Sequence, residues 1–248
     1  MQPENGHRLS LIATLWSLVR QAHHGPAGTA DSARQQLLER YGCAIQRYLR
    51  KLLRDPDAAD EVFQEFALSL LRGDLRGADP KRGRFRNFVK GTLFHLIADY
   101  RKQRRQWPRP LPADGAEPVT NSEELESDSE FVESWCDELL ARAWAALAEI
   151  EHRTGQPLYA VLRFRADHPG MRSPQMAEQL ATRLGKSFTA AGVRQILHRA
   201  REKFAQLLLD EVTESLENPT PEQLEQELVE LSLLDFCRPV LERHSLKV

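Results

Sequence analysis

Long apolar runs and paired cysteines are both missing from this sequence of 248 residues. No run approaches the ~20 apolar residues that a membrane-spanning helix needs, so we expect no membrane partner. The one candidate signal peptide, Leu9 to Val19, is short and is followed by Arg20 without a small-residue cleavage site. Cys43, Cys136 and Cys237 lie far apart with no CxxC pair, which argues against a disulfide framework or a zinc site. The sequence therefore predicts a cytoplasmic protein.

Sequence patterns of catalysis are also missing. Asp60, Glu61 and Glu65 could act as nuclease carboxylates, but no matching set follows elsewhere in the chain. Glu149 and His152 form a single ExxH pair, whereas a di-iron bundle needs two such pairs and further carboxylates. No metalloprotease, hydrolase or phosphate-loop motif is present. We therefore expect no enzyme, no catalytic residue, no metal and no cofactor.

Charge is unevenly placed, although the formal net charge is only −2. Residues 81 to 109 contain ten basic side chains and one acid, Asp99. Residues 114 to 138 contain ten acids and neither lysine nor arginine. Such asymmetry predicts a surface that binds a polyanion and a separate acidic segment.

Apolar residues recur with helical spacing over nearly the whole chain, and the alternation typical of strands is absent. Asp55 and Pro56 supply a cap and a first-turn proline between two of these stretches. The fold class that follows is all-α. The expected helices span residues 9–19, 32–53, 57–72, 82–105, 129–155 and 157–166, with a further pair after residue 173.

A helix-turn-helix pattern lies at residues 173–204. Ser173 is expected to cap its first helix, with Pro174 as the first helical residue; Gly185 ends that helix, and Thr189 caps the second. Small residues at the start of the second helix, with arginine and glutamine on its outward face, fit a helix that enters the major groove. A merely solvated arginine-rich helix is the alternative, and the residues alone leave both open.

The segment from Arg82 to Arg105 combines cations with aromatic side chains. Cations neutralise phosphates, and aromatic rings stack on bases that leave a duplex. An aromatic residue at helical spacing is nevertheless more often part of a core. We expect at least half of this set to be buried: Phe85, Phe88, Phe94, Leu96, Ile97 and Tyr100.

Several segments, in their order and spacing, resemble a bacterial RNA polymerase sigma factor of the small, two-domain extracytoplasmic-function (ECF) type. The closest group is the one abundant in planctomycetes. The resemblance covers most of the chain except residues 107–155. It rests on LWSLVRQA (15–22), RYGCAIQRYLRKL (40–52), DPDAADEVFQEFALSLL (55–71), GADPKRGRFRNFVKGTLFHLIADYRKQRR (77–105), the helix pair from Ser173 and the tail from Asp210 to Leu234.

This resemblance implies two helical domains and a set of partners. A sigma region 2-like bundle would span residues 9–106, and a region 4-like domain would span residues 129–212. An acidic, proline-rich linker (107–128) would join them, and a helical extension (213–248) would follow. The implied partners are core RNA polymerase, through its β′ clamp helices and β flap, promoter DNA, and an anti-sigma or kinase regulator.

The helix that follows Asp55 is implied to dock on the β′ coiled-coil clamp. An acidic and polar face beside an apolar one suits a basic partner helix. The polymerase-binding residues implied here are Asp57, Asp60, Glu61, Gln64 and Glu65.

The loop and helix from Gly77 to Arg105 are implied to read and melt the promoter's minus-ten element, with a pocket for a flipped base. Phe88 stands where the family commonly has tryptophan, and His95 where it commonly has asparagine. The DNA-facing residues implied here are Lys81, Arg82, Arg84, Arg86, Asn87, Phe88, Lys90, His95, Arg101, Lys102, Arg104 and Arg105.

The helix pair after residue 173 is implied to bind the minus-thirty-five element. Its turn is slightly longer than the usual family turn, which affects the expected angle of the recognition helix. The DNA-facing residues implied here are Arg183, Lys186, Ser187, Thr189, Arg194, Gln195, His198, Arg199 and Arg201.

The C-terminal tail carries a further helix signal. Thr220 to Gln223 form a capping box with a first-turn proline, and leucines follow on one face up to Leu234. This helix would either pack on a DNA-binding module and hold the factor inactive, or complete the core of the second domain.

The alternative function of the protein is that of a helix-turn-helix regulator that binds duplex DNA without polymerase. That alternative leaves the basic and aromatic segment unexplained.

Overall fold

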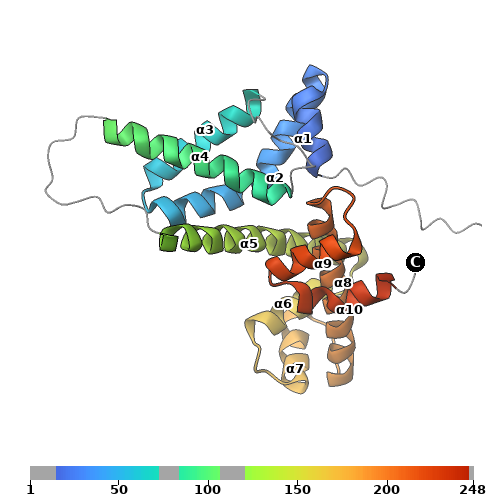
Figure 1. Ribbon diagram of the computed structural model, residues 1–248. Helices are drawn as coiled ribbons and strands as arrows, with labels where there is room; N and C mark the ends of the chain where they lie inside the picture. Colours follow the sequence, from blue (N-terminus) through green and yellow to red (C-terminus); the bar gives the residue numbers. More distant parts are fainter. Residues whose placement is uncertain (1–14, 73–83, 107–120, 246–248) are drawn as a thin grey trace, which may run out of the picture. The chain divides into compact units, whose positions relative to one another are not determined.

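The structure is a computed structural model that describes residues 15–72, 84–106 and 121–245 (Figure 1). Every regular element in these residues is an α-helix, which confirms the all-α fold class. The helices are α1 (Leu15–His24), α2 (Ala27–Leu53), α3 (Pro56–Arg72), α4 (Phe85–Gln106), α5 (Asn121–Thr154), α6 (Leu158–Asp167), α7 (Ser173–Leu184), α8 (Ala190–Glu214), α9 (Pro221–Glu230) and α10 (Leu234–Ser245).

Helix boundaries follow the local signals in the sequence. The side chain of Asp55 accepts hydrogen bonds from the backbone N–H groups of Asp57 and Ala58, as expected for the cap of α3. Gly185 ends α7 in the left-handed conformation with φ 64°, where a side chain would be strained. The Thr189 hydroxyl accepts a hydrogen bond from the Gly192 N–H at 3.0 Å and caps α8.

Several boundaries differ from the predictions. Helix α1 ends at His24 rather than at Val19, and α2 begins at Ala27 rather than at Ser32. Helix α5 begins at Asn121, inside the segment expected to be a linker, whose residues 107–120 lie outside the described residues. Helix α7 begins at Ser173 itself, with Arg172 as its cap residue, since the Gln175 side chain accepts a hydrogen bond from the Arg172 N–H. The tail forms two helices, because Ser232 with φ 57° interrupts the chain between α9 and α10.

The chain divides into two compact units. The N-terminal unit comprises residues 1–138 and 213–224, and the C-terminal unit comprises residues 139–212 and 225–248. The first half of α5 and the end of α8 therefore belong to the N-terminal unit, whereas the sequence placed them with the second domain and its extension.

Aromatic packing explains why the first half of α5 joins the N-terminal unit. Trp135 stacks on Tyr41 of α2 with ring centroids 4.6 Å apart, and Phe131 meets Tyr48 edge-on at 5.1 Å. Phe85 at the start of α4 lies 5.4 Å from the Tyr41 ring. These rings are buried, and they join α2, α4 and α5 in one core.

Two arginine–glutamate pairs tie residues 213–224 to the same unit. Arg20 of α1 donates to Glu217 at 2.6 Å, and Arg40 of α2 donates to Glu214. Leu216 between these acids is buried. The end of α8 and the turn after it therefore contribute both charge and apolar surface to the N-terminal unit.

The C-terminal unit is built around α8. The buried side chains of α8 include Val193, Leu197, Ala200, Phe204 and Leu208, which recur at helical spacing as predicted. Trp144 lies 4.5 Å from the Phe204 ring, and Phe236 of α10 approaches that ring edge-on at 5.6 Å. The tail therefore supplies part of this unit's packing.

Cys237 of α10 shows how deeply the tail enters the C-terminal unit. Its side chain is fully buried, with Sγ 4.0 Å from the carbonyl oxygen of Ala205. Burial raises the pKa of this thiol to about 11, which keeps it protonated and unreactive at neutral pH. The thiol acts as a small apolar group of the core.

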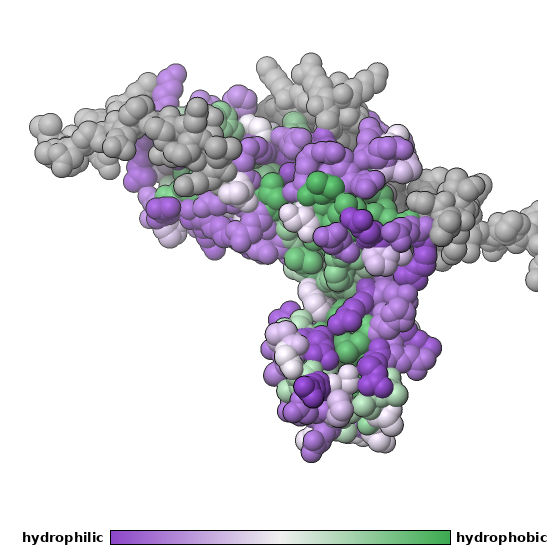
Figure 2. Space-filling view, turned by 60° about the horizontal axis from the view of Figure 1, so that its bottom comes forward, coloured by the Kyte–Doolittle hydropathy of each residue, from purple (hydrophilic) through white to green (hydrophobic). Residues whose placement is uncertain are grey.

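On the face drawn in Figure 2, hydrophilic residues predominate, and hydrophobic residues gather near the centre of the view. Within the part of the chain that the structure describes, no helix is long and apolar enough to cross a bilayer. The described residues also contain no group of three or more metal-ligating side chains. The large apolar side chains that are exposed are Leu68, Leu71, Phe94, Val229 and Phe236.

Candidate nucleic-acid interface

Helix α4 separates a buried face from an exposed one. Its buried side chains, Phe85, Val89, Leu93 and Ile97, recur every four residues. This spacing places them on one side of the helix, against the rest of the N-terminal unit. The exposed positions on the other side include Asn87, Phe94, His95, Arg101 and Lys102.

Fewer of the apolar and aromatic candidates on α4 are buried than expected. Phe85 and Ile97 are buried, whereas Phe88, Leu96 and Tyr100 are half-buried. Phe94 keeps 57% of its surface exposed and meets the neighbouring His95 ring edge-on at 6.1 Å. An exposed phenylalanine beside an imidazole provides flat surfaces on which a base can stack.

The predicted cations of α4 lie in different surroundings. Arg86 is only 4% exposed, so it does not share the solvent-facing side of the helix. Arg84 is half-buried, whereas Arg101 and Lys102 are exposed and form no ion pair with a described residue. Lys81 and Arg82 and the side chain of Arg105 lie outside the described residues.

Two cations of α4 are already paired with acids. The Lys90 ammonium lies 2.6 Å from the Asp128 carboxylate of α5. Arg104 donates to Asp55 at 3.0 Å and to the Tyr100 hydroxyl at 3.0 Å. The hydrogen bond from Arg104 lowers the pKa of Asp55, and the same bond raises the pKa of Arg104. At these two cations a DNA phosphate would compete with the acid that is already bound.

Helix α3 presents the predicted polar face to solvent. Asp57, Glu61, Gln64 and Glu65 are exposed, while Asp60 is half-buried and lies 3.3 Å from Arg50 of α2. The opposite face carries the buried residues Ala58, Ala59, Val62, Phe66 and Leu70. The core of the unit thus orients the acidic face outward.

Two exposed leucines extend this face, and sequence reasoning missed them. Leu68 is 40% exposed and Leu71 is 46% exposed. Leu68 follows Glu61 by seven residues and Glu65 by three, so the acids and the leucines form one stripe along α3. The helical spacing from the predicted acids is the signal that could have identified them.

The helix-turn-helix of the C-terminal unit exposes every residue predicted to face DNA. These residues are Arg183, Lys186, Ser187, Thr189, Arg194, Gln195, His198, Arg199 and Arg201. His198 lies 3.4 Å from Glu202, one turn further along α8. The arginines of this group form no ion pair with a described residue. Their charge is therefore available to a polyanion.

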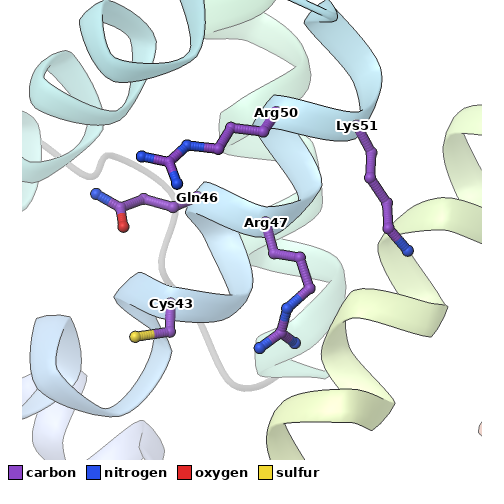
Figure 3. A pocket seen from close by; sticks show the side chains of 5 residues that line it. All are labelled: Cys43, Gln46, Arg47, Arg50 and Lys51. Carbon is purple, nitrogen blue, oxygen red and sulfur yellow. The ribbon is translucent and has the colours of Figure 1, made fainter. Parts of the chain in front are cut away.

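A hollow of about 500 Å³ lies along α2 (Figure 3). It is lined by Cys43, Gln46, Arg47, Arg50 and Lys51. Each of its three cations is engaged by an acid. Arg47 lies 3.7 Å from Asp137, Arg50 lies 3.3 Å from Asp60, and Lys51 lies 2.6 Å from Glu133.

These ion pairs neutralise the walls of the hollow. The hydrogen bond from Lys51 lowers the pKa of Glu133, which keeps that carboxylate charged. The paired cations join α2 to α3 and to the first half of α5, so they stabilise the packing of the N-terminal unit.

Comparison with known families identifies part of the chain. Residues 37–106 match the model of sigma-70 region 2, a stretch that begins within α2 and ends at the last residue of α4. No curated protein and no solved structure matches the chain. The match covers 70 of the 248 residues, and it shows that this segment is similar to sigma-70 region 2.

Proposed function

We propose that this protein is an ECF-type sigma factor of the planctomycete-like group that directs core RNA polymerase to promoters through the minus-ten and minus-thirty-five elements. The observation that carries this proposal is that two helices within the matched residues 37–106 expose surfaces of different chemistry. Within them, α3 exposes an acidic and apolar stripe, while α4 exposes cations and an aromatic side chain. One face suits a protein partner, and the other suits a nucleic acid.

The α3 stripe would dock on the β′ clamp helices. Its exposed acids, Asp57, Glu61 and Glu65, complement a basic partner helix. Leu68 and Leu71 add apolar area, which supplies affinity that charges alone seldom provide. Asp60 would contribute less, because Arg50 already engages it.

The exposed face of α4 would hold the minus-ten element as it melts. Arg101 and Lys102 can neutralise phosphates directly, while Phe94 and His95 offer rings for an unpaired base. Arg86 would contribute through the fold of the region rather than by contact, because it is buried. The remaining predicted contacts of this helix stay proposals.

The helix-turn-helix would bind the minus-thirty-five element. Thr189 caps α8 at the end that would enter the major groove, and Gly192 approaches the Thr189 hydroxyl so closely that an added Cβ would lie 3.2 Å from it. Arg194 and His198 follow one turn apart along the exposed face. This arrangement suits a helix whose first turns contact base edges.

The test is in vitro transcription with core polymerase and a promoter library. A sigma factor would form a complex with core polymerase, open promoters only in that complex, and select a shared pair of sequence elements. Tight binding to duplex DNA by the protein alone, with no complex and no polymerase-dependent opening, would favour the helix-turn-helix regulator instead. An anti-sigma or kinase regulator would be sought by its effect on the same reaction.

A further inference from the structure

The acidic start of α5 lies against the helix that we propose to bind the minus-ten element. Asp128 of α5 holds Lys90 of α4 at 2.6 Å, and neither side chain is deeply buried, with 54% and 35% of their surfaces exposed. Lys90 stands one turn before Phe94 and one turn after Asn87 on α4. Its ammonium group therefore borders the exposed face of α4, while an acid of the same chain neutralises its charge.

We propose that the first turns of α5, up to Glu130, are an electrostatic strap that competes with the DNA backbone for Lys90. This inference rests on the proposed function, since it assumes that α4 faces DNA. Residues 121–130 contain five acids, no lysine and no arginine. DNA presents the same charge to Lys90 at higher density, so it can replace the carboxylate.

The strap can open without unfolding the unit. In the turn that holds Lys90, Asp128 and Ser129 are exposed and Glu130 is half-buried, so little apolar surface resists the fraying of this turn. The next residues are anchored, because Phe131 packs on Tyr48 and Trp135 stacks on Tyr41. Local opening of α5 should therefore stop at Phe131, where its buried packing begins.

The test measures binding of the full-length protein to a fluorescently labelled duplex with an unpaired stretch at its centre. Asp128→Asn is expected to raise the affinity about two- to five-fold, the range for an exposed ion pair. The dependence of log affinity on log salt should stay close to that of the wild-type protein, because Lys90 neutralises the same phosphate in both once the acid is displaced. The variant's thermal midpoint should stay close to that of the wild-type protein.

Two controls separate competition from a general change of charge. Glu133→Gln makes the same change in charge on the same helix, but Glu133 pairs with Lys51 of α2, so its effect on affinity should be smaller. In a Lys90→Gln background, Asp128→Asn should give no gain. An equal gain from Glu133→Gln, or an undiminished gain without Lys90, would overturn the strap.

Hydrogen exchange gives an independent readout. Addition of the same DNA should speed exchange in residues 121–130 and leave residues 131–138 protected, whereas uniform protection of both stretches would contradict local opening. Parallel transcription with core polymerase separates the two proposals. If the wild-type protein initiates transcription but Asp128→Asn behaves as Glu133→Gln does, only the strap fails. If no polymerase-dependent initiation occurs, the proposed function fails.

Discussion

The two helices that we propose to face DNA, α4 and α8, carry similar cations in different surroundings. On α4, Lys90 and Arg104 are each held by an acid from another helix or its cap. On α8, Arg194, Arg199 and Arg201 are exposed and form no ion pair with a described residue. An acid that engages a cation competes with phosphate for it, whereas an unengaged cation meets no such competition. We therefore expect the α8 arginines to bind phosphate directly, as Arg101 and Lys102 of α4 would, whereas Lys90 and Arg104 would bind it in competition with their acids.

The largest expected effect comes from removing the scaffold that holds α4. Trp135→Ala deletes a fully buried ring between α2, α4 and α5 and should lower the free energy of unfolding by about 3–5 kcal/mol. Urea denaturation followed by circular dichroism measures this change. Phe94→Ala on the exposed face is the matched control and should change stability by less than about 0.5 kcal/mol. Equal stability of the two variants would show that α5 is no part of this scaffold.

The next effect concerns the protein-facing helix. Replacement of both Leu68 and Leu71 by aspartate should weaken binding to core polymerase by roughly tenfold or more, because exposed apolar contact area is lost. Competition for core polymerase against a labelled wild-type protein measures the change. Val229→Asp places a negative charge on an exposed apolar position of the tail and should leave that affinity nearly unchanged. If this tail variant weakens binding as much, the α3 stripe is not the docking surface.

A smaller effect should separate the two DNA-facing helices directly. Arg101→Ala with Lys102→Ala removes two unengaged cations from α4, and Arg199→Ala with Arg201→Ala does the same on α8. Each pair should reduce the salt slope of promoter binding by up to about 1.8, or about 0.9 for each lost phosphate contact. Arg104→Ala should change it less, because Asp55 already holds Arg104. An unchanged slope for the α4 pair would refute these residues as phosphate contacts.

The smallest effect is a pH dependence of stability from the Asp55–Arg104 contact. The hydrogen bond from Arg104 lowers the pKa of Asp55 below its ordinary value of 3.8 in the folded protein. The stabilisation is therefore present above pH 3.8 and is lost as the pH falls through the lower folded-state value. Denaturation at several acidic pH values should show a flatter decline for Asp55→Asn than for the wild-type protein. Identical declines would contradict a charged Asp55 as the partner of Arg104.

Local structure was largely predictable because its causes are local. Asp55 and Thr189 cap helices through side-chain oxygens a few residues from the donors, and Gly185 ends α7 as expected. The buried residues of α8 follow from helical periodicity alone. The exposure of the predicted DNA-facing residues on the helix-turn-helix follows from the same pattern. These features depend on neighbours along the chain, which the sequence displays directly.

The candidate site on α4 was less predictable because its residues respond to distant partners. Nothing near Lys90 in the sequence indicates that Asp128 will hold it, and nothing near Arg86 indicates that it will be buried. The stripe of Phe131 and Trp135 was visible, but its partners on α2 lie more than eighty residues away. Periodicity identifies which face of a helix is apolar, not which helix covers it.

The sequence by itself determined the helical fold, the capped ends of α3, α7 and α8 at Asp55, Gly185 and Thr189, the acidic face of α3 and the arginine-rich face of α8. Only the tertiary structure decided that the first half of α5 completes the N-terminal unit and that acids from other segments hold two cations of α4. The reason is that helix formation depends on capping and periodicity within a few turns. The state of a charge, by contrast, depends on whichever groups the packed core brings within a few ångströms of it.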